Sequence, residues 1–134
     1  MKHIFFVFLF VSSSYFLNAQ SLKGTAWLLV SIDNLEAGKS TVTNEKTPIS
    51  LRFDSDTTYS GTGCNNYKGV YKTGNNKSLA MNKAEFTGTE NCLGLGNLEK
   101  ETIIYYTKAA RYRMDEGRFF IFTSDDYRLC FKKQ

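Results

Sequence analysis

Short segments in which apolar and polar residues alternate make up most of this chain, and this pattern constrains the fold more than any other feature. Residues 49–54, for example, run Ile-Ser-Leu-Arg-Phe-Asp, which is typical of a strand with one buried face. Turn-forming Gly, Asn and Asp residues separate these segments. Segments of this kind cover residues 26–32, 49–53, 57–63, 67–73, 79–82, 84–87, 111–115, 118–123 and 127–132.

Residues 98–110 break the alternation, because they contain neither glycine nor proline and place apolar residues such as Leu98 and Tyr105 at helical spacing. Glu99 and Glu101 near its start favour the positive end of a helix dipole. The 134 residues, of which 42% are hydrophobic, fit one packed domain. We therefore predict an α+β fold, a curled and partly barrel-like antiparallel β-sheet of about eight short strands with one helix packed against it.

The first 19 residues are typical of a secretory signal peptide. Lys2 and His3 give a basic start, an apolar run follows, and Ala19 marks the expected cleavage site. The uncharged stretch 4–17 is shorter than the roughly 20 residues that a membrane-spanning helix needs. We expect residues 1–19 to be removed, residues 20–134 to form an exported domain, periplasmic or secreted, and no transmembrane span to remain.

His3 is the only histidine, so the mature chain would carry no imidazole. That removes the commonest general base near neutral pH and the commonest zinc and copper ligand. Three scattered thiols without imidazole do not make a zinc site. We expect no catalytic residues, no metal and no cofactor.

The three cysteines, Cys64, Cys92 and Cys130, predict one disulfide and one free thiol in an exported chain, with three pairings open. We favour Cys64 with Cys92, because both adjoin turn-like segments, and leave Cys130 as the free thiol. Closing that loop would stabilise the fold by about 3 to 4 kcal/mol on the chain-entropy model.

The formal net charge of +4 is spread along the chain and not gathered into blocks, so the sequence predicts neither a nucleic-acid arm nor a polybasic membrane patch. Two carboxylate pairs, Asp54 with Asp56 and Asp125 with Asp126, fall in predicted turns.

Tyrosines are abundant and either line a ligand groove or close the inner faces of a small sheet, and we favour the second role. They are Tyr59, Tyr67, Tyr71, Tyr105, Tyr106, Tyr112 and Tyr127.

The run of residues 61–71, G-T-G-C-N-N-Y-K-G-V-Y, lacks the glycine that a phosphate-binding loop needs at the place of Asn66. Gly61 and Gly63 are expected to allow a bulge and left-handed backbone. With Trp27 before it and Cys92 after it, this run resembles the META domain, or HslJ-like, family over residues 22–132. The positions that carry the resemblance, which we interpret as structural, are Gly61, Gly63, Cys64, Asn65, Tyr67, Gly69 and Tyr71.

The resemblance implies a stress-associated bacterial envelope protein without established catalytic residues. We therefore expect a monomeric, non-enzymatic binding or scaffolding module with a concave, Tyr-lined face for an envelope protein or an amphiphilic ligand. Two alternatives stay open. One is a carboxylate-based enzyme acting on a glycan, and the other is a disulfide-sensing protein in which Cys130 exchanges with Cys64 or Cys92.

Overall fold

The computed structural model describes residues 21–43, 48–87 and 96–134. The expected signal peptide, its cleavage site at Ala19 and Cys92 lie outside these residues. The described chain forms ten strands, one α-helix and one short 3-10 turn, η1. In chain order they are β1 (Ala26–Asn34), β2 (Lys39–Val42), β3 (Ser50–Phe53), β4 (Thr58–Thr62), β5 (Asn66–Thr73), η1 (Asn75–Lys77), β6 (Leu79–Met81), β7 (Glu85–Thr87), α1 (Gly96–Thr107), β8 (Ala109–Asp115), β9 (Arg118–Thr123) and β10 (Tyr127–Lys133).

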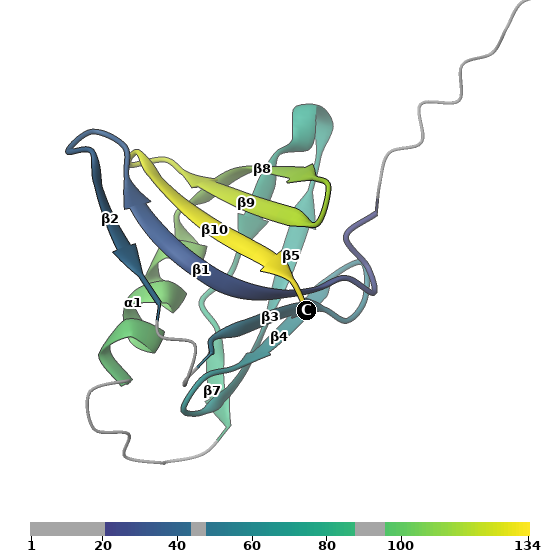
Figure 1. The fold of residues 1–134 in the computed structure, drawn as a ribbon. Helices are drawn as coiled ribbons and strands as arrows, with labels where there is room; N and C mark the ends of the chain where they lie inside the picture. The colour runs from purple at the N-terminus through teal and green to yellow at the C-terminus, as the bar shows by residue number, and fades with distance from the viewer. Residues whose placement is uncertain (1–20, 44–47, 88–95) are drawn as a thin grey trace, which may run out of the picture.

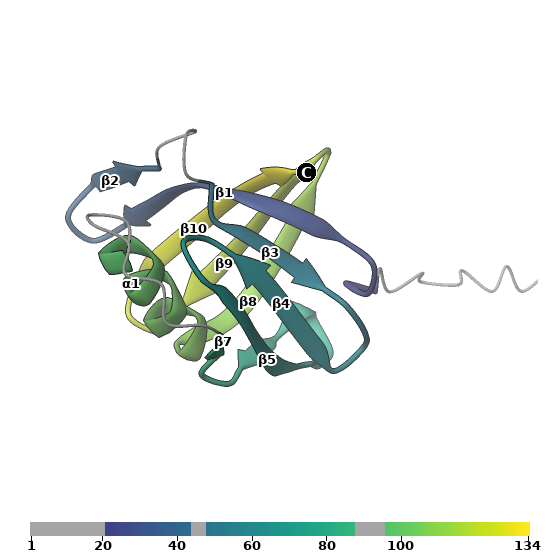
Figure 2. The same ribbon diagram turned by 90° about the horizontal axis from the view of Figure 1, so that it is seen from below.

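All strand pairs are antiparallel, and the sheet runs in the order β6-β5-β4-β3-β1-β10-β9-β8. β2 is added to β1, and β7 to β5. The two ends of this order come together, because an isolated bridge joins Ser78, just before β6, to Arg111 in β8. The sheet is therefore a nearly closed barrel with one seam (Figure 1), and α1 lies against one side of it, as the view from below shows (Figure 2).

The predicted fold class is confirmed, with two differences in its elements. The helix begins at Gly96 and ends at Thr107, because Ala109 already pairs with Thr123 in the β8–β9 ladder. β2 is not among the predicted strands, since all four of its residues are exposed and give no alternation. It forms because its backbone pairs with β1 from Ser31 to Asn34.

The inward-facing residues of the strands fill the barrel. Phe119 stacks on Trp27 with ring centroids 5.1 Å apart and meets Phe53 edge-on at 5.6 Å. The helix closes the core with Ile103 and Tyr106, which are 1% and 0% exposed. Other side chains buried in this core are Leu51, Tyr59, Tyr67, Ile121, Leu129 and Phe131.

Candidate functional site

The tyrosines of β4 and β5 point into the interior of the barrel, where their rings are packed in the core. Tyr59, Tyr67 and Tyr106 are at most 2% exposed. The Tyr59 hydroxyl donates to the Asn82 carbonyl at 2.5 Å, and the Tyr67 hydroxyl donates to the Ser50 carbonyl and lies 3.1 Å from that of Tyr106. Burial raises the pKa of all three. These rings are part of the packed core, the role favoured for them from the sequence.

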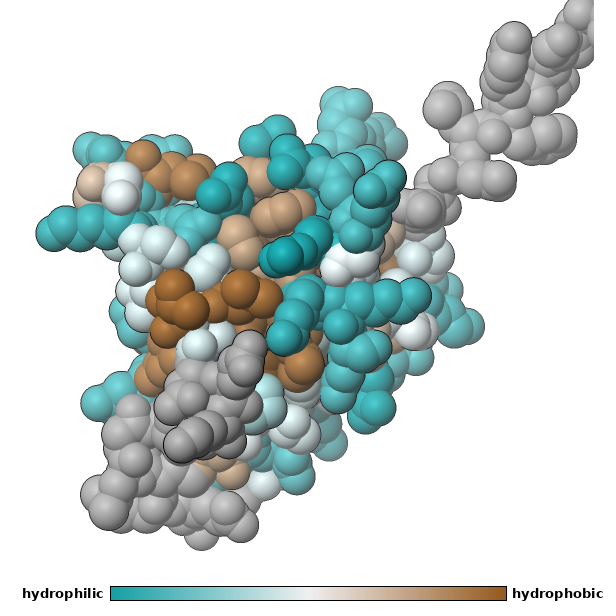
Figure 3. Space-filling view, in the orientation of Figure 1, coloured by the Kyte–Doolittle hydropathy of each residue, from teal (hydrophilic) through white to brown (hydrophobic). Residues whose placement is uncertain are grey.

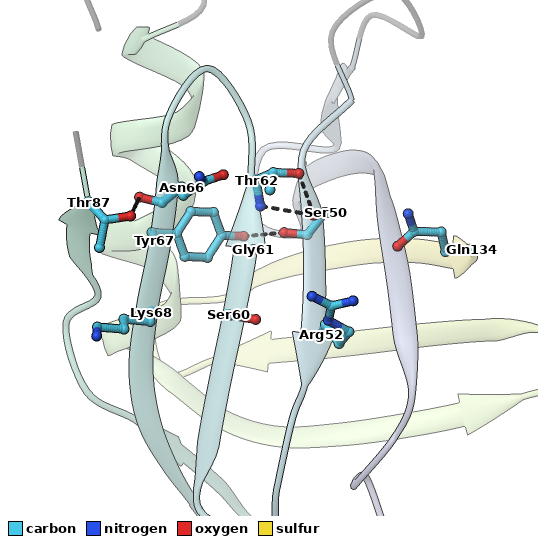
Figure 4. A pocket seen from close by; sticks show the side chains of 10 residues that line it. All are labelled: Ser50, Arg52, Ser60, Gly61, Thr62, Asn66, Tyr67, Lys68, Thr87 and Gln134. Carbon is cyan, nitrogen blue, oxygen red and sulfur yellow. Dashed lines mark hydrogen bonds between the residues drawn. The ribbon is translucent and has the colours of Figure 1, made fainter. Parts of the chain in front are cut away.

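The glycines of the signature run make room for these rings. Gly61 pairs with Tyr67 across β4 and β5, and Gly69 pairs with Tyr59. A Cβ at Gly61 would lie 2.1 Å from the Ser50 carbonyl oxygen and 2.2 Å from the Tyr67 ring, and one at Gly69 would lie 2.6 Å from the Tyr59 ring. Figure 4 shows the Tyr67 hydroxyl directed past Gly61 toward Ser50. Neither Gly61 nor Gly63 has a positive φ, so the expectation of left-handed backbone is wrong. Space, and not backbone freedom, requires glycine at positions 61 and 69.

Glu99, in the first turn of α1, holds the connection between β4 and β5. It is 1% exposed, and both of its carboxylate oxygens accept the Asn65 backbone N–H at 3.2 Å. A Cβ at Gly63 would approach the Glu99 carboxyl carbon to 3.1 Å. This contact could not be predicted from the sequence, because acidic residues in the first turn of a helix are common and normally face solvent.

The cysteines have different environments. Cys64 is disulfide-bonded; Cys92 lies outside the described residues, so its pairing with Cys64 stays a prediction. Cys130 is a free, buried thiol whose Sγ donates to Asp33 Oδ2 at 3.3 Å. Burial raises the pKa of this thiol. Because the thiolate is the reactive form, this environment counts against disulfide exchange at Cys130.

The predicted carboxylate pairs lie at opposite ends of the barrel, in the connections β3–β4 and β9–β10 (Figure 1). Asp54 forms an ion pair with Arg52 at 3.2 Å, and Asp125 binds Lys108 Nζ at 2.7 Å. The pKa of Asp125 is lowered by hydrogen bonds from Lys108 and Thr123. The structure therefore does not bring the two pairs together.

Two hollows lie on the outer face of β3, β4 and β5. The first, of about 420 Å³, is lined by hydroxyl groups, including those of Ser50 and Thr62, which are 2.9 Å apart (Figure 4). Arg52 and Lys68 flank its Ser60 along one cross-strand row. The second, of about 530 Å³, has Asp54 and Glu85 among its lining residues. Asp54 pairs with Arg52, and Glu85 lies opposite Lys68, so each of these two cations has a carboxylate next to it.

A different surface gathers cations and aromatic rings. We define the Arg–Phe face as the outward-facing side chains Arg111 and Arg113 of β8, Phe120 and Phe122 of β9, and Arg128 of β10. The Arg113 guanidinium carbon lies 4.7 Å from the Phe120 ring centroid, and that of Arg111 lies 5.1 Å from the Phe122 centroid. On the β10 side, the Arg128 guanidinium carbon lies 6.0 Å from the Phe120 ring centroid. The two half-buried rings are thus flanked by guanidinium groups on both neighbouring strands.

The strand register explains how this face forms. Phe122 lies opposite Arg111 on one side and Arg128 on the other, and Phe120 lies between Arg113 and Cys130. Arg128 donates to Asp33 Oδ2 from two nitrogens, at 2.8 and 3.1 Å. Burial raises the pKa of Asp33, but its hydrogen bonds from Ser40, Arg128 and Cys130 outweigh that effect and hold the pKa below its usual value.

Basic side chains gather on this side of the sheet. Arg118 and Lys132 lie opposite each other in the next cross-strand row. Within the described residues, Asp33 forms an ion pair with Arg128, and Asp115 forms one with Arg113. The basic residues are dispersed along the chain, as the sequence showed, but the folded sheet collects them.

An apolar groove adjoins the Arg–Phe face. We define the β1 groove as the hollow of about 570 Å³ lined by Leu28, Val30, Val42 and Pro48, among other residues. Leu28 lies opposite Lys132 in the sheet, so the groove and the basic rows are continuous. Val42 is 73% exposed. In Figure 3, apolar side chains gather over the middle of the molecule and are bordered by hydrophilic ones.

Within the residues that the structure describes, no helix is both long and apolar enough to cross a membrane.

The fold is shared with solved structures whose sequences have diverged widely. The NMR structure of a protein from Burkholderia xenovorans is similar with a TM-score of 0.70 and 20% identity, over 84% of this chain and 83% of that one. The crystal structure of a DUF4847 family protein from Bacteroides vulgatus ATCC 8482 gives a TM-score of 0.61 and 15% identity, over 84% and 96% of the two chains. No curated protein matches. The family model of the META domain matches residues 20–134, which contain the signature run and the whole barrel, and the chain therefore belongs to the META domain family.

Proposed function

We propose that this protein is an exported, non-enzymatic binding module of the cell envelope, stress-associated as the family resemblance implies, and that it binds as a monomer through the Arg–Phe face. The observation that carries the proposal is the grouping of three arginines, Arg111, Arg113 and Arg128, around two half-buried Phe rings on one side of the sheet. Exposed clusters of aromatic and arginine side chains are typical of binding surfaces.

The core tyrosines stabilise the fold, and we assign ligand binding to the outer face of the barrel. The core tyrosines have their hydroxyls hydrogen-bonded within the protein, and this leaves recognition to side chains outside the barrel. On the Arg–Phe face, Arg111 and Arg113 lie over aromatic rings, a contact that uses the flat face of the guanidinium and leaves its edge for hydrogen bonds. One edge nitrogen of Arg113 pairs with Asp115.

Export is supported by the leader-like residues 1–19 and by the disulfide at Cys64, because disulfides persist in oxidising compartments. The test is to express the full chain with a C-terminal tag, fractionate the cells, and determine the N-terminus and the disulfide map of the recovered protein. We expect cleavage beside Ala19 and a Cys64–Cys92 linkage. Full-length, reduced protein confined to the cytosol would overturn export.

Binding is tested by titrating isotope-labelled mature protein with detergent-solubilised envelope fractions and following backbone amide resonances. We expect shifts concentrated in β8, β9 and β10. The double variant Arg111→Gln/Arg113→Gln should reduce them. The matched control Arg52→Gln/Lys68→Gln removes the same charge from the outer face of β3 and β5 and should leave them unchanged. Equal effects of both double variants, or no shifts in the unsubstituted protein, would contradict the proposal.

The glycan-enzyme alternative has one specific observation in its favour, since Asp54 and Glu85 line the same hollow. If the protein hydrolyses glycans through these carboxylates, turnover on a panel of envelope glycans should be lost in both Asp54→Asn and Glu85→Gln. Turnover that both substitutions abolish would replace the binding proposal with an enzymatic one.

A further inference from the structure

We infer that a hollow on the outer face of β3, β4, β5 and β7 binds an uncharged saccharide. We define the hydroxyl hollow as the cavity of about 420 Å³ whose polar lining includes Ser50, Ser60, Thr62, Asn66, Thr87 and Gln134. It shares no residue with the Arg–Phe face, so the inference goes beyond the proposed function. It follows from the arrangement of these side chains, their unused hydrogen-bonding capacity and the charge around them.

The polar side chains form a row that crosses four neighbouring strands. Asn66 of β5 lies opposite Thr62 of β4 on one side and opposite Thr87 of β7 on the other. Ser50 of β3 extends the row, since its hydroxyl oxygen is 2.9 Å from that of Thr62. Neighbouring strands are about 4.8 Å apart, so the row presents one hydroxyl or amide at each such step. A chain of sugar rings that lies across the strands would meet a polar group at every step.

The row offers donors and acceptors that the protein itself does not use. Ser50 Oγ accepts the Thr62 backbone N–H at 2.9 Å, and the two hydroxyls share one hydrogen in the bond between them. One hydroxyl hydrogen of the pair is therefore left for a ligand. Within the described residues, the side-chain amides of Asn66 and Gln134 form no hydrogen bond, and each amide has an acceptor oxygen and a donor NH₂ group. In Figure 4 these two side chains stand on either side of the Ser50–Thr62 pair.

The core holds the base of the hollow in place. Ser50 is 9% exposed, and its backbone carbonyl accepts the Tyr67 hydroxyl from inside the barrel. The Ser50–Thr62 pair is thus already ordered before a ligand arrives. Such ordering lowers the entropy that is lost on binding.

The charge around the hollow favours a neutral ligand over an anion. The cations in its lining are Arg52 and Lys68. Arg52 forms an ion pair with Asp54 at 3.2 Å, and Lys68 lies opposite Glu85. A phosphate or carboxylate ligand would compete with these carboxylates. A saccharide hydroxyl needs no net charge, because it both donates and accepts hydrogen bonds, as the row of hydroxyls and amides does.

The experiment titrates isotope-labelled mature protein, residues 20–134, with the neutral saccharides maltotriose, cellotriose and chitotriose and follows backbone amide resonances. We expect at least one of them to shift the resonances of Ser50, Thr62 and Asn66. The affinity should not change with added salt, because salt screens charges and the ligand has none. Inorganic phosphate, the comparison ligand, should bind more weakly than that saccharide.

Two substitutions remove groups that carry the inference. Thr62→Val deletes a hydroxyl and keeps the shape of the side chain, so it should weaken saccharide binding about 5-fold, the contribution of one neutral hydrogen bond. Asn66→Ala deletes both a donor and an acceptor and should weaken binding about 10-fold. The matched control is Thr41→Val in the exposed strand β2, outside the hollow. It removes no hydrogen bond to the ligand and should change binding less than about 2-fold.

Circular dichroism of each variant checks that the fold is retained, and all three substituted residues are exposed. The inference is overturned if none of the saccharides shifts these resonances, or if Thr62→Val and Thr41→Val weaken binding equally. Phosphate that binds more tightly than every saccharide would also overturn it, because the hollow would then be an anion site. Arg111→Gln/Arg113→Gln should leave saccharide binding unchanged, and a loss there would place the saccharide on the Arg–Phe face instead. This inference and the proposed function can therefore fail separately.

Discussion

The interior of β4 and β5 and the outer face of β8 to β10 are both aromatic clusters built from cross-strand pairs, and they differ in the partner that each ring meets. Inside, Tyr67 lies over Gly61 and Tyr59 over Gly69. Outside, Phe122 has arginines as its neighbours on both sides. The same sheet geometry thus produces a tightly packed core in one place and a charged, accessible surface in the other.

The contrast separates residues that stabilise the fold from residues that are accessible for recognition. A fully buried aromatic side chain removes about 150 to 250 Å² from water, whereas an exposed cation–π contact contributes about 0.5 to 1 kcal/mol. Disturbing the interior should therefore cost much more stability than disturbing the Arg–Phe face, and the following substitutions test this order from the largest effect to the smallest.

Gly61→Ala should break the interior cluster. The added Cβ would lie 2.1 Å from a backbone oxygen, which cannot rotate away, so we expect a loss of about 3 kcal/mol or more in the free energy of unfolding. Urea denaturation measures it. Ser60→Ala, at the neighbouring outward-facing position of β4, is the control and should cost less than about 0.5 kcal/mol. If the Gly61→Ala protein were as stable as the control, the Tyr67 ring and the Ser50 carbonyl would not enclose position 61.

Alkaline pH should destabilise the interior. Burial raises the pKa of Tyr59, Tyr67 and Tyr106, while an unfolded tyrosine ionises near pH 10. Their contribution to stability is therefore fully present below about pH 10 and is lost as the pH rises above it. We expect a major part of the phenolate absorbance to appear together with loss of the near-ultraviolet circular dichroism. Complete ionisation of the folded protein near pH 10 would contradict the burial of these rings.

Asp33→Asn tests the boundary between β1 and the Arg–Phe face. Asp33 accepts charge-assisted hydrogen bonds from Arg128, and we expect their loss to cost about 1 to 2 kcal/mol. Because the folded pKa of Asp33 is lowered, its contribution is present above about pH 4 and disappears as the pH falls further. The difference between the two proteins should accordingly shrink in acid, as measured by urea denaturation over a pH series. A difference that is constant with pH would assign the effect to packing instead.

Arg111→Gln should have the smallest effect on stability. It removes one cation–π contact at 5.1 Å, worth about 0.5 to 1 kcal/mol, and leaves Phe122 in place against Arg128. Thermal unfolding measures the change. A loss comparable to that of Gly61→Ala would mean that the Arg–Phe face is part of the structural framework and is not free for recognition.

Alternation of side chains and turn residues were enough to predict the strands, the late helix and the fold class, since these depend on local spacing. The same information could not distinguish a glycine that needs left-handed backbone from one that needs space. The difference at Gly61 depends on Tyr67 of the neighbouring strand and on Ser50 of another, contacts that only the sheet register creates. Glu99 was missed for the same reason, because its partner Asn65 is 34 residues away.

The order of the amino acids specifies which residues lie on opposite faces of each strand, because a strand turns successive side chains to opposite sides. Arg111 and Arg113 therefore share one face of their strand, and Phe120 and Phe122 share one face of theirs. That these strands lie next to one another, in a register that places rings between arginines and joins them to the β1 groove, depends on tertiary packing. Strand order and register are set by packing of the whole core, and they turned a dispersed charge into a basic face.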